Sequence, residues 1–299
     1  MQTFCGWPPL PRHGSGPAHT AGGIGPALLE ENNMEGQNLR IVVKVGTSTL
    51  TRDNFSINFH AMDRLAMTLA DLHGQGHEII LVSSGAIAVG AGKLGLKERP
   101  TELRMKQAVA AAGQCELMHI YDKLFGEYGA TVGQILLTDE DVADPRRAEH
   151  LENTFDALME MGCIPVVNEN DSVSSAEIET GQARVLGDND TLSAIVARLC
   201  RADLLILMSD IDGLYDKDPH KYPDAKLVSR VNAVTAELRA SAGGAGTSRG
   251  TGGMQTKLDA AEIAMSAGVD MVITNGSAPE LIYDIAAGAD IGTRFCAAR

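Results

Sequence analysis

The chain has 299 residues, of which 44% are hydrophobic and 21% charged, and its formal net charge is −14. This length and composition are typical of a globular protein with one large α/β domain or two small ones. No apolar run approaches the roughly eighteen residues of a membrane-spanning helix, so we expect no membrane partner. The negative charge argues against nucleic acid as a partner, although a few local cations can still hold a small anion. The five cysteines show no metal-ligand spacing, which indicates a reducing compartment, and we expect a cytoplasmic protein.

Residues 1–36 differ in composition from the rest of the chain. They contain five prolines and seven glycines without hydrophobic periodicity, so we expect a disordered tail. The tail lacks the basic start and apolar centre of a secretory signal, and it is not rich in arginine or serine. We therefore predict a single folded domain over residues 37–299.

From Leu39 onwards, apolar runs of strand length alternate with segments of helical periodicity. The predicted strands are 40–45, 78–82, 131–137, 164–167, 204–208 and 271–274. The predicted helices are 57–73, 101–125 with a break near Gly113, 146–161, 191–199, 254–267 and 280–287. This alternation predicts a largely parallel sheet with helices on both faces. Nearly every polar or glycine-rich cluster follows a predicted strand, where such sheets bind their ligands.

Lys44 is a cation inside the apolar run 40–45, directly before the segment Gly46–Ser48. A buried cation is costly unless it meets an anion. The alternative is a lysine whose stem is buried and whose ammonium group reaches water. We favour an anion site, because Gly46–Ser48 offers backbone N–H groups and hydroxyls beside the lysine.

The stretch Gly187–Asp190 places three polar side chains after a turn glycine and before the apolar helix 191–199. Aspartate and asparagine are preferred helix caps, so a structural cap is one interpretation. Three in a row exceed what capping requires, so a ligand-binding corner is the other. The stretch alone does not separate the two.

Two further clusters follow predicted strands. The small-residue turn Ser83–Ala86 opens a helix, and its N–H groups either face an anion or serve close packing. The polar cluster Asn168–Asp171 is either a surface loop or, together with Gly187–Asp190, an acidic site for an ammonium group, or for Mg²⁺ and lysine.

The glycine-rich segment Gly243–Lys257 enters the helix 254–267. It is either a flexible linker or a phosphate cradle. Lys257 at the helix start favours the cradle, because the helix dipole disfavours a cation there unless an anion is present. The Walker A pattern and the GxGxxG fingerprint after a first strand are both missing, so a nicotinamide oxidoreductase is disfavoured.

Taken together, these stretches resemble the amino acid kinase family, and within it the branch that phosphorylates L-glutamate. The resemblance covers the chain from about Leu39 to its end. The motifs that carry it are, in order, Lys44–Ser48, Ser83–Ile87, Ala108–Gln114, Asn168–Asp171, Gly187–Asp190, Ser209–Tyr215 and Gly250–Lys257.

The resemblance implies a three-layer αβα sandwich around a mainly parallel sheet. It implies ATP-dependent phosphorylation of the side-chain carboxylate of L-glutamate to L-glutamyl 5-phosphate, the first step of proline biosynthesis, with ATP and Mg²⁺ as cofactors. It further implies a homo-oligomer, commonly a dimer or tetramer, and feedback inhibition by proline. A sibling kinase with another carboxylate or phosphate acceptor, and a non-catalytic sensing module of the same fold, are the alternatives.

Carried over residue by residue, the resemblance assigns glutamate contacts to Ser84, Asp171 and Asn189. Lys44 and Lys257 would flank the transferred phosphoryl group, with Asp190 holding both. The residues implied for ATP are Lys44, Ser209, Asp210, Thr251, Gly252, Gly253, Met254, Gln255, Thr256 and Lys257. No metal ligand is assigned. The acceptor carboxylate is ionised at neutral pH, so the reaction requires cations and alignment rather than a general base.

The chain departs from the family pattern in three places. Bacterial members usually carry a C-terminal PUA domain, and this chain ends near Gly292–Phe295, where the kinase domain would end, so we expect the kinase domain alone. The connection Glu179–Leu186 is longer than usual, which makes it a candidate for altered substrate-loop geometry or feedback control. The tail 1–36 has no counterpart in the family pattern.

Overall fold

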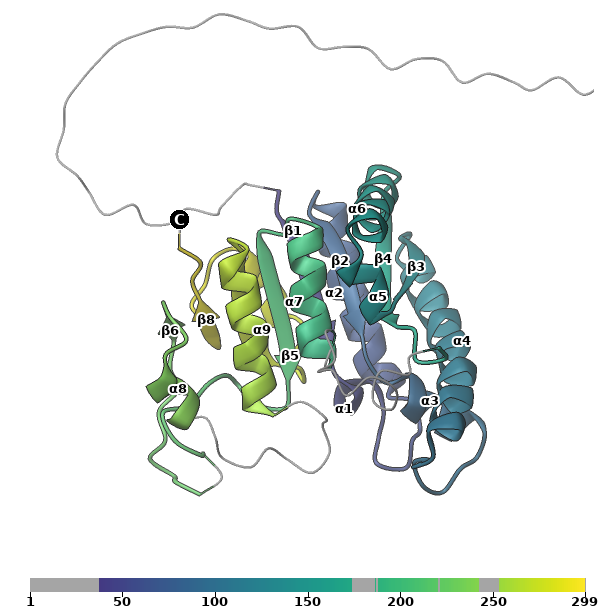
Figure 1. The fold of residues 1–299 in the computed structure, drawn as a ribbon, viewed down its shortest axis with the longest axis horizontal. Coiled ribbons are helices and arrows are strands. Elements are labelled where there is room, and N and C mark those ends of the chain that lie inside the picture. Colours follow the sequence, from purple (N-terminus) through teal and green to yellow (C-terminus); the bar gives the residue numbers. More distant parts are fainter. Residues whose placement is uncertain (1–37, 174–185, 187, 220, 242–252, 299) are drawn as a thin grey trace, which may run out of the picture. The chain divides into compact units, whose positions relative to one another are not determined.

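The computed structural model of the chain describes residues 38–298 except 174–185, 187, 220 and 242–252. The predicted tail 1–36, the Gly187 turn, most of the connection 179–186 and most of the glycine-rich segment therefore lie outside the described residues. The described part forms one sheet with helices packed on both of its faces (Figure 1).

The sheet has eight strands in the order β3-β4-β2-β1-β5-β7-β8-β6. At its centre, β1 (Arg40–Val45) pairs in parallel with β2 (Glu78–Ser83) and β5 (Leu204–Ser209). The outer strands are β3 (Thr131–Leu137), β4 (Cys163–Glu169), β6 (Arg230–Val231), β7 (Asp270–Asn275) and β8 (Thr293–Phe295). Only the β7–β8 pair is antiparallel among the named strands, so the prediction of a largely parallel sheet is confirmed.

Two apolar cores form because successive side chains of a strand point to opposite faces of the sheet. On one face, Ile41, Val43 and Val45 of β1 belong to the core under α2 (Phe59–Gly74), α4 (Leu103–Glu127) and α10 (Leu281–Ala286). On the other face, Val42 belongs to the core under α6 (Pro145–Glu160), α7 (Asn189–Leu199) and α9 (Met254–Ser266). Figure 1 shows α7 and α9 in front of the sheet and α2 behind it. The predicted three-layer αβα sandwich is confirmed.

Four shorter helices complete the described elements. They are α1 (Thr47–Leu50), α3 (Ala86–Lys93), α5 (Asp139–Ala143) and α8 (Ala236–Ser241). Within the described ranges, no helix combines the length and apolarity needed to cross a membrane.

The predicted break near Gly113 is wrong, because α4 runs without interruption through this residue. Gly113 instead permits close packing: a Cβ at this position would lie 1.8 Å from the carbonyl oxygen of Ala86 in α3. Gly90 is its counterpart on α3, since a Cβ there would lie 2.0 Å from the carbonyl oxygen of Val109 in α4. Here glycine marks the contact of two backbones rather than the end of a helix.

The carboxyl ends of the parallel strands meet at one edge of the sheet. The polar clusters predicted from the sequence follow there, at Gly46 after β1, Ser84 after β2, Asn170 after β4 and Asp210 after β5. Backbone hydrogen bonds connect neighbouring ends, such as the 3.1 Å bond from Ser84 N–H to the Val45 carbonyl. The candidate site therefore lies at this edge.

Candidate active site

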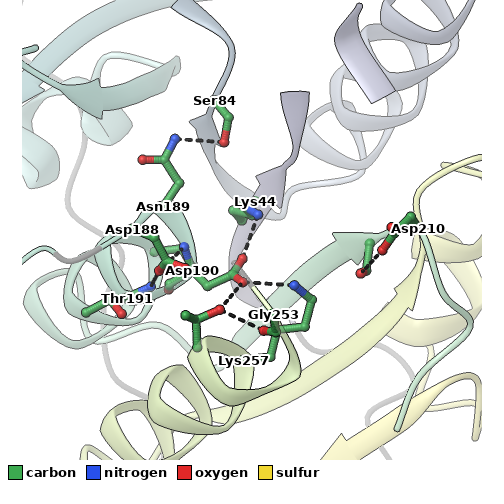
Figure 2. Close-up of polar contacts among 12 residues, drawn as sticks. Lys44, Ser84, Asp188, Asn189, Asp190, Thr191, Asp210, Gly253 and Lys257 are labelled. Atoms are coloured by element: carbon green, nitrogen blue, oxygen red, sulfur yellow. Dashed lines mark hydrogen bonds and ion pairs between the residues drawn. The ribbon is translucent and has the colours of Figure 1, made fainter. Parts of the chain in front are cut away.

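A buried carboxylate between two buried lysines lies at the centre of this edge (Figure 2). The Oδ1 atom of Asp190 is 2.6 Å from Lys44 Nζ, and its Oδ2 atom is 2.9 Å from Lys257 Nζ. The exposed fractions of Lys44, Asp190 and Lys257 are 9%, 1% and 7%. We call these three residues the charged centre.

Three elements bring the charged centre together. Lys44 shares a face of β1 with Val42 and therefore points towards α7 and α9. Asp190 lies in the first turn of α7, and Lys257 lies in the first turn of α9. Positions 44, 190 and 257 are far apart in sequence, and they become neighbours because α7 and α9 pack on the face of the sheet that carries Lys44.

The carboxyl group of Asp190 is held in its ionised form. Burial acts to raise its pKa, but the charges of Lys44 and Lys257 outweigh burial and lower the pKa below the ordinary value of 3.8. Two ammonium groups and one carboxylate leave one formal positive charge in a nearly dry place. Such a centre suits an anionic ligand whose charge completes the balance.

Thr256 is a further neighbour of Asp190. Its hydroxyl lies 3.2 Å from Asp190 Oδ2 and 2.8 Å from the Gly253 carbonyl oxygen, so it contacts the same carboxylate oxygen as Lys257. The family resemblance implied for Thr256 only a contact with ATP. The structure shows that its side chain contacts the charged centre.

The side chain of Asp188 caps α7. Its Oδ1 atom accepts hydrogen bonds from the backbone N–H groups of Asp190 and Thr191, at 3.1 and 3.0 Å. The capping interpretation thus holds for the first residue of the polar triplet. Asn189 remains available for a ligand-binding role, whereas Asp190 holds the two lysines, so the two interpretations of this stretch apply to different residues within it.

Asn189 lies against the turn after β2. Its Nδ2 atom donates to Ser84 Oγ at 2.7 Å and more weakly to Ser83 O at 3.3 Å. Figure 2 shows the Asn189 side-chain oxygen directed away from Ser84. Gly85 follows in the left-handed region with φ of 96°, which turns the chain into α3. The predicted neighbours Ser84 and Asn189 are therefore in direct contact.

Asn168 and Gln114 support this contact from behind. Asn168 Oδ1 accepts from the Glu169 backbone N–H at 2.9 Å, and the Asn168 amide donates to Gln114 Oε1 at 2.9 Å. Asn189 Nδ2 also lies 3.4 Å from Asn168 Oδ1. Both residues stood in quoted motifs without an assigned role. The signal for Asn168 is an asparagine inside a buried strand, but nothing local predicts that Gln114, 54 residues away, is its partner.

Asp171 occupies a partly buried position two residues beyond β4. The backbone N–H of Asn170 donates to the Leu137 carbonyl at 2.7 Å, which fixes the start of this loop beside β3. The loop thus begins at the same edge as Ser84 and Asn189. The Asp171 carboxylate is the acidic group that we predicted as a partner for an ammonium ligand.

Ser209 and Asp210 lie apart from the charged centre, at the end of β5. The Ser209 hydroxyl donates to Asp210 Oδ1 at 3.2 Å, and in Figure 2 Asp210 lies to the right of Lys44 and Lys257, whereas Asn189 lies to their left. The next carboxylate, Asp212, accepts from Asn275 Nδ2 at 2.7 Å and from the Tyr215 hydroxyl at 3.3 Å. The bond to Asn275 connects the loop after β5 to the end of β7.

The described part of the predicted ATP segment forms the start of α9. Gly253 precedes the helix, Met254 packs partly buried against the core, and Gln255 is exposed. The first N–H groups of a helix have no partner within it and attract anions. The prediction for Thr251 and Gly252 lies outside the described residues.

The profile of the Amino acid kinase family matches residues 39–275 of the chain. A protein of Clostridium perfringens named glutamate 5-kinase is 54% identical over 258 residues, which are 86% of this chain and 95% of that protein. Proteins of the same name from Listeria monocytogenes and Clostridium tetani are 54% and 52% identical, over 86% and 85% of this chain and 92% and 93% of theirs.

Solved structures of other kinases share the fold. Carbamate kinase from Giardia lamblia bound to AMP-PNP has a TM-score of 0.62 at 12% identity, covering 87% of this chain and 99% of that one. The isopentenyl phosphate kinase product complex of T. acidophilum has a TM-score of 0.57 at 19% identity, covering 86% and 99%. At these identities the likeness establishes the fold alone.

Proposed function

The chain belongs to the amino acid kinase family, and from this premise we propose that it transfers the γ-phosphoryl group of ATP to the side-chain carboxylate of L-glutamate. The product is L-glutamyl 5-phosphate, which begins proline biosynthesis. The observation that carries the proposal is the buried pair of lysines held by one carboxylate at the ligand-binding edge. The choice of glutamate rests on the relatives of that name, which match over nearly their whole length.

In the proposed step, a carboxylate oxygen of glutamate forms a bond to the γ-phosphorus. The bond from this phosphorus to the oxygen that bridges to the β-phosphorus breaks, and its electron pair leaves with ADP. The attacking carboxylate has an ordinary pKa of about 4.3 and is already ionised at neutral pH. No proton is removed from the nucleophile, so the site needs alignment and charge neutralisation.

We assign the neutralisation to Lys44 and Lys257. Their ammonium groups would meet the phosphoryl oxygens in a dry environment, where such contacts are stronger than in water. Asp190 fixes both groups in advance, so little reorganisation is needed during the reaction. Its lowered pKa makes it a weak base, which agrees with an organising role.

We assign glutamate binding to the corner formed by Ser84, Asn189 and Asp171. Asn189 Nδ2 is directed to Ser84 and its neighbours, so the side-chain oxygen is the atom presented to a ligand. An acceptor oxygen and the Asp171 carboxylate suit the α-ammonium group of an amino acid. The Ser84 hydroxyl accepts from Asn189 and keeps its own hydrogen for a substrate carboxylate.

We assign ATP to Ser209, Asp210 and the segment Thr251–Lys257, on the opposite side of the charged centre. Mg²⁺ is the proposed second cofactor. Among the described residues, no cluster of three or more His, Cys, Asp or Glu side chains is arranged to hold a metal ion. Mg²⁺ commonly binds phosphate oxygens and water with few protein ligands. Ser209, Asp210 and the start of α9 therefore fit a Mg²⁺ ion that is held mainly by the phosphates of the nucleotide. Bound there, it would neutralise phosphate charge.

Three further features of the proposal rest on the family resemblance. We propose that the protein acts in the cytoplasm, that it forms a homo-oligomer, and that proline inhibits it. The masses of the oligomers in solution and a proline titration of the initial rate test the last two.

The decisive test is the reaction of the purified full chain with ATP, Mg²⁺ and L-glutamate. An acyl phosphate product reacts with hydroxylamine to give a hydroxamate, and ADP release should follow glutamate concentration. Aspartate, N-acetylglutamate and UMP serve as competing acceptors. ADP release without dependence on glutamate would overturn the proposal, and a preference for another acceptor would indicate a sibling kinase.

A non-catalytic sensing module is the second candidate function. It is disfavoured by the presence of Lys44, Asp190 and Lys257 in contact, since a sensor has no need for a phosphoryl-transfer centre. Isothermal titration that shows glutamate and ATP binding without turnover would favour it.

A further inference from the structure

The two serines at the end of β2 point in opposite directions. Ser83 follows Ile79 and Leu81 on the strand face that belongs to the core under α4, whereas Ser84 continues the other face, towards α7. Ser84 Oγ accordingly meets Asn189 of α7. Ser83 Oγ meets a residue of α4 that has no assigned role in the reaction.

That residue is Tyr121, whose hydroxyl lies 2.8 Å from Ser83 Oγ. Tyr121 is only 1% exposed and belongs to the core beneath the sheet. It lies seven residues after Gln114, which places both on one face of α4 two turns apart. The same helix face therefore contacts the substrate corner twice, through Gln114 to Asn168 and through Tyr121 to Ser83.

The direction of these hydrogen bonds follows from the supply of hydrogens. Both hydroxyl hydrogens are used when Tyr121 donates to Ser83 Oγ at 2.8 Å and Ser83 donates to the Ser84 carbonyl at 3.1 Å, because a carbonyl can only accept. Burial raises the pKa of Tyr121 well above its ordinary value, although the bond to Ser83 opposes this shift. The hydroxyl therefore stays protonated and remains a donor at all physiological pH values.

We propose that Tyr121 is a positioning residue for glutamate, which acts by holding the backbone at Ser84 against α4. The inference rests on the proposed function. On one side, hydrogen bonds run from Tyr121 through Ser83 to the Ser84 carbonyl. On the other side, Asn189 donates to the Ser84 hydroxyl and to the Ser83 carbonyl. Without Tyr121, Ser83 can rotate away from the Ser84 carbonyl, and the Ser84 hydroxyl loses its fixed place beside the substrate.

The effect should appear in glutamate binding more than in the chemical step. The hydrogen bonds from Tyr121 end at Ser84, whereas the charged centre is held by α7, α9 and β1. Loss of one buried hydrogen bond predicts a rise of about fivefold in KM for glutamate. The KM for ATP should stay unchanged, and kcat should change less than KM for glutamate.

The test compares Tyr121→Phe with Ser83→Ala, their double variant and the wild-type chain. Tyr121→Phe keeps the ring and removes only the donor, and Ser83→Ala removes the acceptor through which it acts. Tyr128→Phe is the matched control, because Tyr128 follows the same helix, is exposed, and donates its hydroxyl at 2.9 Å to Asp63. Both KM values, kcat, calorimetric glutamate affinity and melting temperature are measured for each protein.

The proposal is supported if both single variants weaken glutamate binding, the double variant is no weaker than Ser83→Ala, and Tyr128→Phe behaves as wild type. Unchanged glutamate KM and affinity in Tyr121→Phe, or an equal rise of both KM values, overturns it. If Tyr121→Phe does not fold, Ser83→Ala decides in the same way. A wild-type chain that neither binds nor phosphorylates glutamate overturns the proposed function as well, whereas an active wild type with an unaffected variant overturns only this inference.

Discussion

The two halves of the candidate site are built from different chemistry. The charged centre consists of one carboxylate and two ammonium groups, all nearly dry. The substrate corner, apart from the carboxylate of partly buried Asp171, is built from neutral side chains: Ser84 and Asn189, with Asn168 and Gln114 supporting them. A charge taken out of water must be balanced wherever it is, whereas a neutral hydrogen-bonded corner costs little to keep open.

This difference separates the expected effects of substitution. A change in the charged centre should alter both stability and the rate of phosphoryl transfer, because the same ion pairs serve both. A change in the substrate corner should alter glutamate binding and leave the fold nearly intact. Each of the following predictions breaks or sharpens this contrast, from the largest effect to the smallest.

Asp190→Asn should have the largest effect. It leaves two buried ammonium groups without their carboxylate, which costs about 3–5 kcal/mol of unfolding free energy and abolishes turnover. Urea unfolding followed by circular dichroism measures the stability. Asp259→Asn is the control, because Asp259 pairs with Arg239 at a half-exposed place and should change stability by less than about 1 kcal/mol. Equal losses in the two variants would contradict the contrast.

The wild-type chain and Asp190→Asn also test how stability depends on pH. Burial opposes ionisation of Asp190, but the two lysines lower its pKa below 3.8 in the folded state. Its stabilisation is therefore fully present above the unfolded pKa and is lost as pH falls through the lower folded pKa. The stability difference between wild type and Asp190→Asn should stay constant from neutral pH to about pH 5 and shrink below about pH 4. A difference that persists in acid would show that the carboxylate charge is not its source.

Lys257→Ala and Lys44→Ala should each lower kcat by about a thousandfold or more, because each removes a cation from the transferred phosphoryl group. The loss of stability should be modest, since Asp190 keeps the other lysine. Hydroxamate formation at saturating substrates measures kcat. Lys93→Ala, which removes a half-exposed lysine paired with Glu116, is the control and should retain full activity. Unchanged turnover in either site variant would remove that lysine from its assigned role.

The sequence predicted the charged half of the site because charge inside apolar elements is conspicuous. Lys44 interrupts a strand whose bounds, Arg40–Val45, were predicted as the structure has them. Asp190 and Lys257 each begin a helix, and a lysine at that place is unfavourable without an anion. The cost of an unpaired lysine identified Lys44 and Lys257, whereas the role of Asp190 came from the family resemblance. In the structure both lysines pair with Asp190.

The neutral half was less predictable because its partners are ordinary residues that are far apart in the chain. In the sequence, nothing distinguishes Gln114 and Tyr121 from ordinary residues of a long helix. They meet Asn168 and Ser83 only because α4 packs under β2 and β4. The predicted helix break at Gly113 was wrong for a related reason. The close backbone contact that requires this glycine is made with α3, and the local sequence does not show it. The short strands β6 and β8 also lacked a local pattern of sufficient length.

Asn189→Ala should raise the KM for glutamate by about ten- to thirtyfold, because it removes the donor to Ser84 and the oxygen assigned to the substrate. The KM for ATP should change little. Asn54→Ala serves as control, since Asn54 accepts only within an exposed turn, from the Ser56 N–H. An effect of Asn189→Ala on stability as large as that of Asp190→Asn would remove the distinction between the two halves.

Asp212→Ala should have the smallest effect and should fall on the nucleotide side. Its carboxylate accepts from Asn275 and Tyr215 and so fixes the loop that begins with Asp210, directly after Ser209 at the end of β5. Because the group is exposed, its loss should raise the KM for ATP by only about two- to fivefold and leave the KM for glutamate unchanged. Asn275→Ala removes the same 2.7 Å bond from its donor side and should reproduce the effect, whereas Asp224→Ala, on a surface pair with Lys217, should not. A rise in the glutamate KM instead would mean that the two sides of the charged centre are not independent.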